Sequence, residues 1–170
     1  MEEHFDKYYI EHNKRLEAPI LKFDDGDSFL LALSVADELD DAADYSNFMS
    51  TNSLDFFYAS TVAPFDETKI MSDPKLASQF REAQALLELF RRGELKTSEV
   101  FDIDLLAKYY AINTLMGDVH PAYWHNVRFY YNPMTSLLEP AGYDSLGVRD
   151  ANEGALQDFF LLPTRPVRAP

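Results

Sequence analysis

The pattern of apolar and polar residues divides the chain into a short strand, several helices and a hairpin in the C-terminal third. Residues 19–23 (PILKF) are mostly apolar and are followed by an Asp-Asp-Gly turn, which predicts a strand. Asp27 or Ser28 caps a predicted helix that runs to about residue 44, because apolar residues recur there at helical spacing. Residues 54–58 (LDFFY) fit either a strand or a buried helix.

Two further helices are predicted with clear ends. The first begins after the N-cap residue Asp73, which a proline follows, and ends near Arg92, before the stop signal Gly93. Its apolar face consists of Leu76, Phe80, Ala83, Leu87 and Phe90. The second helix begins near Asp102 and ends at Gly117. Its predicted inner face consists of Leu105, Leu106, Tyr109, Ile112 and Leu115.

A β-hairpin is predicted after the second helix. Residues 127–131 (VRFYY) favour a strand, residues 132–135 (NPMT) favour a turn, and residues 137–140 lead back along the first strand. A last helix is predicted over residues 153–160, before a proline-rich end. Together these elements predict an α+β fold that is mostly helical, with the hairpin carrying the functional site.

Polar side chains are expected to converge at the open end of this hairpin. With the turn centred near Met134, Asn126 faces Gly142, so that Asn126 and Asp144 lie at the same end of the paired strands. Asp118 ends the preceding helix and enters the loop that leads to the hairpin. Oxygen ligands of this kind suit Mg²⁺ that also holds nucleotide phosphates, and a further Asp can accept the proton of a substrate hydroxyl.

Two other interpretations of these residues stay open. An Asp after a helix and an Asn before a strand are common capping residues, which is a purely structural role. Alternatively, His120 and His125 form a zinc or iron site with Asp118, and a metal hydrolase would use Asp144 as well. The neighbouring Tyr123 and Trp124 are interpreted as core and loop anchors. The chain contains neither a glycine-rich phosphate loop nor a GxSxG nucleophile motif.

The composition and charge of the chain exclude some kinds of binding partner and site. The chain has 170 residues, enough for one domain, and 15 Lys and Arg against 29 Asp and Glu give a net charge of −14. This charge argues against binding nucleic acid or anionic lipid and favours basic partners. There is no cysteine, which excludes disulfides and thiolate zinc sites. No apolar run is long enough to predict a membrane-spanning helix. The acidic residues 37–44 are interpreted as a solvated helix face.

Three collinear segments resemble the core of the spore-coat protein H (CotH) kinase family. They are residues 101–118, which end in Gly-Asp, residues 125–133, which open with His-Asn and contain a Tyr-Tyr-x-Pro hairpin, and residues 139–144, which end in Gly-Tyr-Asp. The opening residues 1–7 and the predicted strand at 19–23 are similar to the family's first conserved segment and its lysine strand. The resemblance covers about residues 1–147.

This resemblance implies an atypical protein-kinase-like fold that transfers phosphate from ATP to Ser or Thr with Mg²⁺. By resemblance, Asp118 takes the place of the catalytic Asp, and Asn126 and Asp144 take the places of the metal ligands. Glu3 and Lys22 are assigned to ATP binding, with Lys22 as a substitute for the cationic residue that pairs the phosphates in the family. The protein substrate is expected to be basic and to carry Ser or Thr, because the acidic chain attracts such partners.

The resemblance also predicts which part of the domain is present. Residues 1–150 are expected to form mainly the helical C-terminal lobe with its catalytic hairpin, without most of the N-terminal lobe, and residues 151–170 form a helix and tail. The chain lacks an apolar signal core, so it is expected in the cytosol, or at a surface if a targeting segment lies upstream. The alternative function is a non-catalytic scaffold, a pseudokinase module of a surface or envelope assembly.

The scaffold alternative is motivated by three differences from the family's pattern. The first is the expected lack of most of the N-terminal lobe. Asn126 follows Asp118 by eight residues, which is longer than the family's spacing, and Leu146 occupies the place of its second Asp. Lys22 also has an alternative interpretation, as a solvated residue on an edge strand.

Overall fold

The central feature of the fold is a four-stranded antiparallel sheet. The computed structural model describes residues 7–24, 26, 30–31, 34, 54–118, 120–143 and 145, with the side chains described from residue 10 onward. The strands have the spatial order β2-β1-β3-β4. Their bounds are Ile20–Asp24 for β1, Thr61–Pro64 for β2, Arg128–Asn132 for β3 and Leu137–Ala141 for β4. The predicted α+β class is confirmed, although the sheet is larger than an isolated hairpin.

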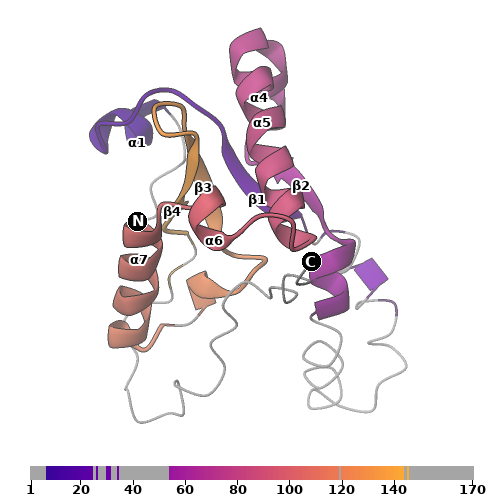
Figure 1. Ribbon diagram of the computed structural model, residues 1–170, viewed down its shortest axis with the longest axis vertical. Coiled ribbons are helices and arrows are strands. Elements are labelled where there is room, and N and C mark those ends of the chain that lie inside the picture. The colour runs from indigo at the N-terminus through magenta and orange to yellow at the C-terminus, as the bar shows by residue number, and fades with distance from the viewer. Residues whose placement is uncertain are drawn as a thin grey trace.

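Helices pack against this sheet and lie beside it (Figure 1). The short helices include α1 (Lys7–His12), α4 (Glu67–Ser72), α6 (Thr97–Val100) and the 3-10 helix η1 (His120–Ala122). The two long ones are α5 (Pro74–Arg91) and α7 (Ile103–Met116). Residues 54–59 are helical, which decides between the two predictions for that segment. No helix in the described part of the chain is long and apolar enough to cross a bilayer, in agreement with the sequence.

The predicted ends of α5 and α7 are confirmed by their capping contacts. The Asp73 carboxylate accepts hydrogen bonds from the Lys75 and Leu76 backbone N–H groups, and the Asp102 carboxylate caps α7 by accepting from the Leu105 N–H. At the other end of α7, Gly117 takes the left-handed conformation with φ of 66°. Helix ends of this kind depend on only a few neighbouring residues, so they can be predicted from the sequence.

The hairpin forms at the predicted position, but its register differs by one residue. A turn centred on Met134 would place Pro140 opposite Arg128, whereas Ala141 is opposite Arg128 in the structure. The loop holds four residues, 133–136, because Ser136 adopts a left-handed φ of 57° and its N–H bonds the Asn132 carbonyl. A four-residue loop has its centre between two residues, which accounts for the shift.

The main hydrophobic core lies between the sheet and α5. The predicted apolar face of α5 is buried and packs against one side of the sheet. From the strands, Leu21, Phe23, Val62, Phe129 and Leu138 enter this core. A parallel bridge between Phe101 and Leu138 joins the segment before α7 to β4. Helix α7 contacts β4 and lies near that strand (Figure 1). Because alternate residues of a strand face opposite sides, Lys22 and Arg128 lie on the other face of the sheet.

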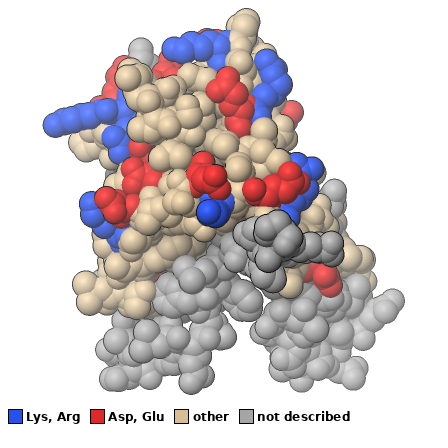
Figure 2. Space-filling model, in the orientation of Figure 1, with Lys and Arg blue, Asp and Glu red and all other residues tan. Residues whose placement is uncertain are grey.

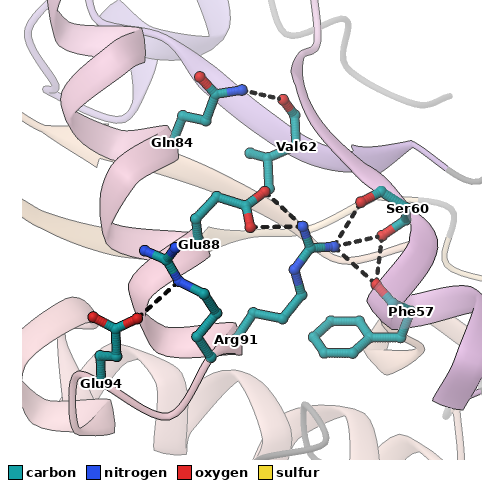
Figure 3. Close-up of polar contacts among 8 residues, drawn as sticks. Phe57, Ser60, Val62, Gln84, Glu88, Arg91 and Glu94 are labelled. Atoms are coloured by element: carbon teal, nitrogen blue, oxygen red, sulfur yellow. Dashed lines mark hydrogen bonds and ion pairs between the residues drawn. The ribbon is translucent and has the colours of Figure 1, made fainter.

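A buried arginine connects the end of α5 to the chain before β2. The Arg91 guanidinium donates to the Phe57 and Ser60 carbonyl oxygens at 2.9 and 2.6 Å and forms an ion pair with Glu88 at 2.6 Å (Figure 3). Arg91 is only 9% exposed. It therefore satisfies two carbonyl groups that have little access to water, and its own charge is balanced by Glu88.

The predicted inner face of α7 is partly wrong. Leu106 is buried and Tyr109 is half-buried, but Ile112 and Leu115 are 56% and 85% exposed. The polar residue Asn113 is buried in their place. Apolar residues occur on more than one side of this helix, so periodicity alone does not identify the side that packs on the sheet.

Several predicted elements lie outside the described residues. Of the helix predicted over residues 27–44, the structure describes only Leu30, Leu31 and Ser34, which are helical. The acidic residues 37–44 and the last helix at 153–160 are not described, and neither is the proposed second segment at 151–170.

We expect Arg91→Leu to lower the free energy of unfolding by about 3 kcal/mol, because the substitution leaves buried carbonyl groups and Glu88 without their partner. The matched control is Arg92→Leu, since the Arg92 side chain is 61% exposed and its loss should change stability by less than about 0.5 kcal/mol. Urea denaturation followed by circular dichroism measures both. Similar losses in the two variants would show that Arg91 does not have this role.

A second pair of variants tests the packing of α7. We expect Leu115→Gln to change the free energy of unfolding by less than about 0.5 kcal/mol because the side chain already faces water. Leu106→Ala, on the buried side of the same helix, should cost about 2–3 kcal/mol. The same denaturation experiment applies, and a large loss in Leu115→Gln would contradict the exposure of that side chain.

Candidate functional site

Asp118 occupies a buried position just after α7. The residue is 2% exposed, and its backbone N–H donates to the Asn113 carbonyl at the helix end. One carboxylate oxygen accepts a hydrogen bond from the Ser145 hydroxyl at 2.7 Å, and the other accepts from the His120 backbone N–H at 3.3 Å. Asp118 therefore joins the end of α7 to both the following loop and the segment after β4.

Asn126 is connected to the same loop through His120. The Asn126 side-chain nitrogen lies 3.1 Å from the ring Nε2 of His120 and 3.1 Å from its backbone oxygen. Because the His120 backbone also donates to Asp118, a single residue contacts both predicted site residues. The expectation that Asp118 and Asn126 share one loop cluster is consistent with this geometry.

The loop that carries these residues is fixed by aromatic contacts. Trp124 is buried and packs edge-on against Phe57 at a centroid distance of 5.8 Å, as expected for a core anchor. The Tyr109 hydroxyl donates to the Pro121 carbonyl at 2.7 Å. Burial raises the pKa of Tyr109, so this hydroxyl keeps its proton and remains a donor. The loop is thus held from α7 and from the core.

The zinc or iron alternative finds no support among the described residues. That part of the chain contains no group of three His, Cys, Asp or Glu side chains placed to hold a metal ion. The His120 ring is engaged with Asn126, and the His125 ring stacks on Tyr123 at 5.8 Å. Asp144, which this alternative would also use, is not described.

Two of the predicted site residues, Asp144 and Glu3, lie outside the described residues. The residues on both sides of Asp144 in the sequence are described. Tyr143 lies under the Arg128 guanidinium, 4.3 Å from the ring centroid, and Ser145 bonds Asp118. Tyr143 and Ser145 therefore both contact residues of the candidate site.

Lys22 lies on an inner strand rather than on an edge. Strand β1 has β2 on one side and β3 on the other, and Lys22 is directly opposite Arg128 of β3. The Lys22 ammonium forms an ion pair with Asp24 at 3.2 Å. A backbone N–H from Gly26 lowers the pKa of Asp24, and the charges of Lys22 and Arg128 add to this effect. The solvated-edge interpretation of Lys22 is therefore wrong.

Arg128 is a component that sequence reasoning missed. It is 7% exposed, and its guanidinium donates to the His125 carbonyl at 2.7 Å while it lies over the Tyr143 ring. Two cations thus share one face of the sheet beside the loop of Asp118. The alternation in residues 127–131 is the signal that could have found it, because it places Arg128 on the opposite face from Phe129.

The same face of the sheet carries a second polar network farther along the hairpin. Glu139 is 5% exposed, pairs with Arg15 at 2.7 Å and accepts from the Asn132 side chain at 2.6 Å. The neighbouring Tyr130 donates its hydroxyl to the Leu16 carbonyl at 2.7 Å. Burial, assisted by the negative charge of Glu139, raises the pKa of Tyr130 to about 12. These contacts fasten the segment before β1 to the hairpin.

The acidic character of the sequence is not evenly distributed. The described part of the chain contains 15 of the 29 acidic residues but 12 of the 15 basic ones, so most of the negative excess belongs to the other residues. On the face drawn in Figure 2, acidic and basic side chains are interspersed among neutral ones. Attraction of a basic substrate by the acidic residues therefore remains a prediction.

Comparison of the chain with protein-family models, curated proteins and solved structures gives no match. The likeness to the CotH kinases therefore rests on the sequence segments quoted above, and the function is argued from the residues and their geometry.

The raised pKa of Tyr130 predicts a loss of stability in alkali. Its contribution is intact below the ordinary pKa of 10.0 and is lost as pH rises toward about 12, because the unfolded chain releases the phenol proton more easily than the folded one. In Tyr130→Phe, the unfolding free energy should fall less steeply between these pH values. Some slope should remain, since the pKa values of Tyr109 and Tyr131 are also raised. Equal slopes in urea titrations of both proteins would contradict this.

Proposed function

We propose that this chain binds ATP with Mg²⁺ and transfers the terminal phosphate to a Ser or Thr hydroxyl of a basic protein, as a CotH-kinase-like domain. The observation that carries the proposal is the arrangement around His120, which holds Asp118 and Asn126 in one short loop. This loop leads directly into β3, the strand that pairs with the lysine strand β1. Candidate proton acceptor, metal ligand and phosphate-binding cation thus belong to adjoining elements.

The side chains of the candidate site offer the kind of donor atom that Mg²⁺ binds. Asn126 offers an oxygen atom, which hard divalent cations prefer, and Asp144 would add another. When bound, Mg²⁺ neutralises charge on the phosphates. In the proposed reaction the substrate hydroxyl oxygen bonds to the terminal phosphorus, the bond from that phosphorus to the ADP oxygen breaks, and the hydroxyl proton moves to Asp118. Lys22 would balance phosphate charge, with Glu3 as a further nucleotide contact.

A second candidate function is a non-catalytic scaffold, and the burial of Asp118 favours it. Both carboxylate oxygens accept hydrogen bonds from within the chain, and the residue is only 2% exposed. A proton acceptor must come within hydrogen-bonding reach of its substrate. Asp118 would therefore have to exchange its bond with Ser145 for a substrate hydroxyl, whereas a scaffold requires no such change.

Thermal unfolding in the presence of nucleotide tests the two functions. For the kinase-like function, millimolar ATP with Mg²⁺ should raise the Tm, because a ligand at 100 times its Kd stabilises the folded state by about 2.7 kcal/mol. Phosphate transfer from labelled ATP to a basic Ser-rich peptide should fall at least about 100-fold in Asp118→Asn. Asp104→Asn, on the exposed side of α7, is the matched control and should keep full transfer.

The outcomes separate the candidates. A Tm that does not change at millimolar ATP and Mg²⁺ rejects the kinase-like function and leaves the scaffold. A nucleotide-dependent rise in Tm without phosphate transfer supports nucleotide binding and rejects the proposed transfer. Transfer that persists in Asp118→Asn removes Asp118 from the proposed chemistry.

A further inference from the structure

We infer that His120 is a positioning residue that fixes the orientation of the Asn126 carboxamide and so presents the Asn126 oxygen, rather than its nitrogen, as a metal ligand. The inference rests on the proposed function for its metal. The orientation itself follows from contacts within the chain. The spacing of the sequence motifs does not predict this orientation of the carboxamide.

The backbone oxygen of His120 determines which way the carboxamide points. This oxygen only accepts hydrogen bonds, and it lies 3.1 Å from the Asn126 side-chain nitrogen. If the carboxamide were turned over, two acceptor oxygens would face each other at this distance. The orientation is therefore fixed by the chemistry of the partner and not by the similar shapes of the two amide branches.

The ring of His120 adds a second contact to the same nitrogen. The amide nitrogen carries two protons, and its two partners are the His120 backbone oxygen and the ring Nε2. Nε2 must therefore accept, which places the ring proton of the neutral tautomer on Nδ1. Both amide protons are used, so rotation of the carboxamide would break two hydrogen bonds together.

The branch that remains for a ligand is the carbonyl oxygen. Mg²⁺ binds amide oxygens and not amide NH₂ groups, whose protons carry partial positive charge. Contacts that orient a ligand in this manner typically change metal affinity by about 10–100-fold when they are removed. His120 is well placed to do so, because the loop around it is held from α7 by the hydrogen bond of Tyr109 to Pro121 and from the core by Trp124.

The first experiment examines the protein without any metal. In ¹⁵N-labelled protein, a nitrogen–nitrogen coupling across the hydrogen bond should be measurable between the Asn126 Nδ2 and the His120 Nε2. A His120 ring with its proton on Nε2, or the absence of this coupling, overturns the inference and leaves the proposed function standing.

The second experiment measures binding of Mn²⁺ with ATP by electron paramagnetic resonance. His120→Leu should weaken Mn²⁺ binding about 10-fold, whereas His120→Gln, which keeps an acceptor near the Nε2 position, should stay within about threefold of the original protein. In an Asn126→Asp background, His120→Leu should change the affinity less than about twofold, because both terminal atoms of the carboxylate are oxygen. Urea denaturation identifies any variant that loses its fold.

The results distinguish the inference from the function on which it rests. Equal affinity in His120→Leu and the original protein overturns the positioning role and keeps the metal site. The same conclusion follows if His120→Leu causes an equal loss in the original and the Asn126→Asp backgrounds. An original protein that binds neither Mn²⁺ nor ATP rejects the proposed function, and the positioning role with it.

Discussion

The pairing of β1 with β3 is the interaction on which the rest of the structure depends. It joins residues near position 20 to residues near position 130, and it puts Leu21 opposite Phe129 and Lys22 opposite Arg128. One face of this pair supplies the core, where the Phe23 and Phe129 rings lie 6.5 Å apart, edge to face. The other face carries Lys22 and Arg128, and Arg128 donates to the His125 carbonyl in the loop of Asp118. The register of β1 and β3 thus determines both the packing of the core and the placement of Lys22 beside Arg128.

The sequence predicted the features that depend on near neighbours. The ends of α5 and α7 follow from a few adjacent residues, and the hairpin follows from its turn. The register of that hairpin did not follow, since it depends on whether Ser136 takes a left-handed conformation. The packed side of α7 was mistaken because Leu115 and Leu106 are equally apolar, and only contacts with β4 decide between them. The four-stranded sheet requires long-range pairing that no local pattern contains.

In the candidate site, too, some features could be predicted from the sequence and others could not. The sequence-based hypothesis placed Asp118 after the helix and Asn126 before the hairpin, and both lie in the segment that joins α7 to β3, while their chemical roles stay predictions. It missed the link through His120, because hydrogen bonding by a backbone oxygen and a ring nitrogen depends on the folded shape of the loop. It also missed Arg128, whose place beside Lys22 requires β1 and β3 to be paired. Residues that act by orienting others are hard to identify without coordinates.

The strand order has a consequence for synthesis on the ribosome. Strands β1 and β2 leave the exit tunnel long before β3 and β4, although β1 lies between β2 and β3 in the finished sheet. Until residue 128 has emerged, one side of β1 carries backbone N–H and C=O groups that are not paired with another strand, next to Leu21 and Phe23. An open strand edge of this kind is a template for pairing with another chain, so the nascent protein is most prone to aggregation before its last two strands arrive.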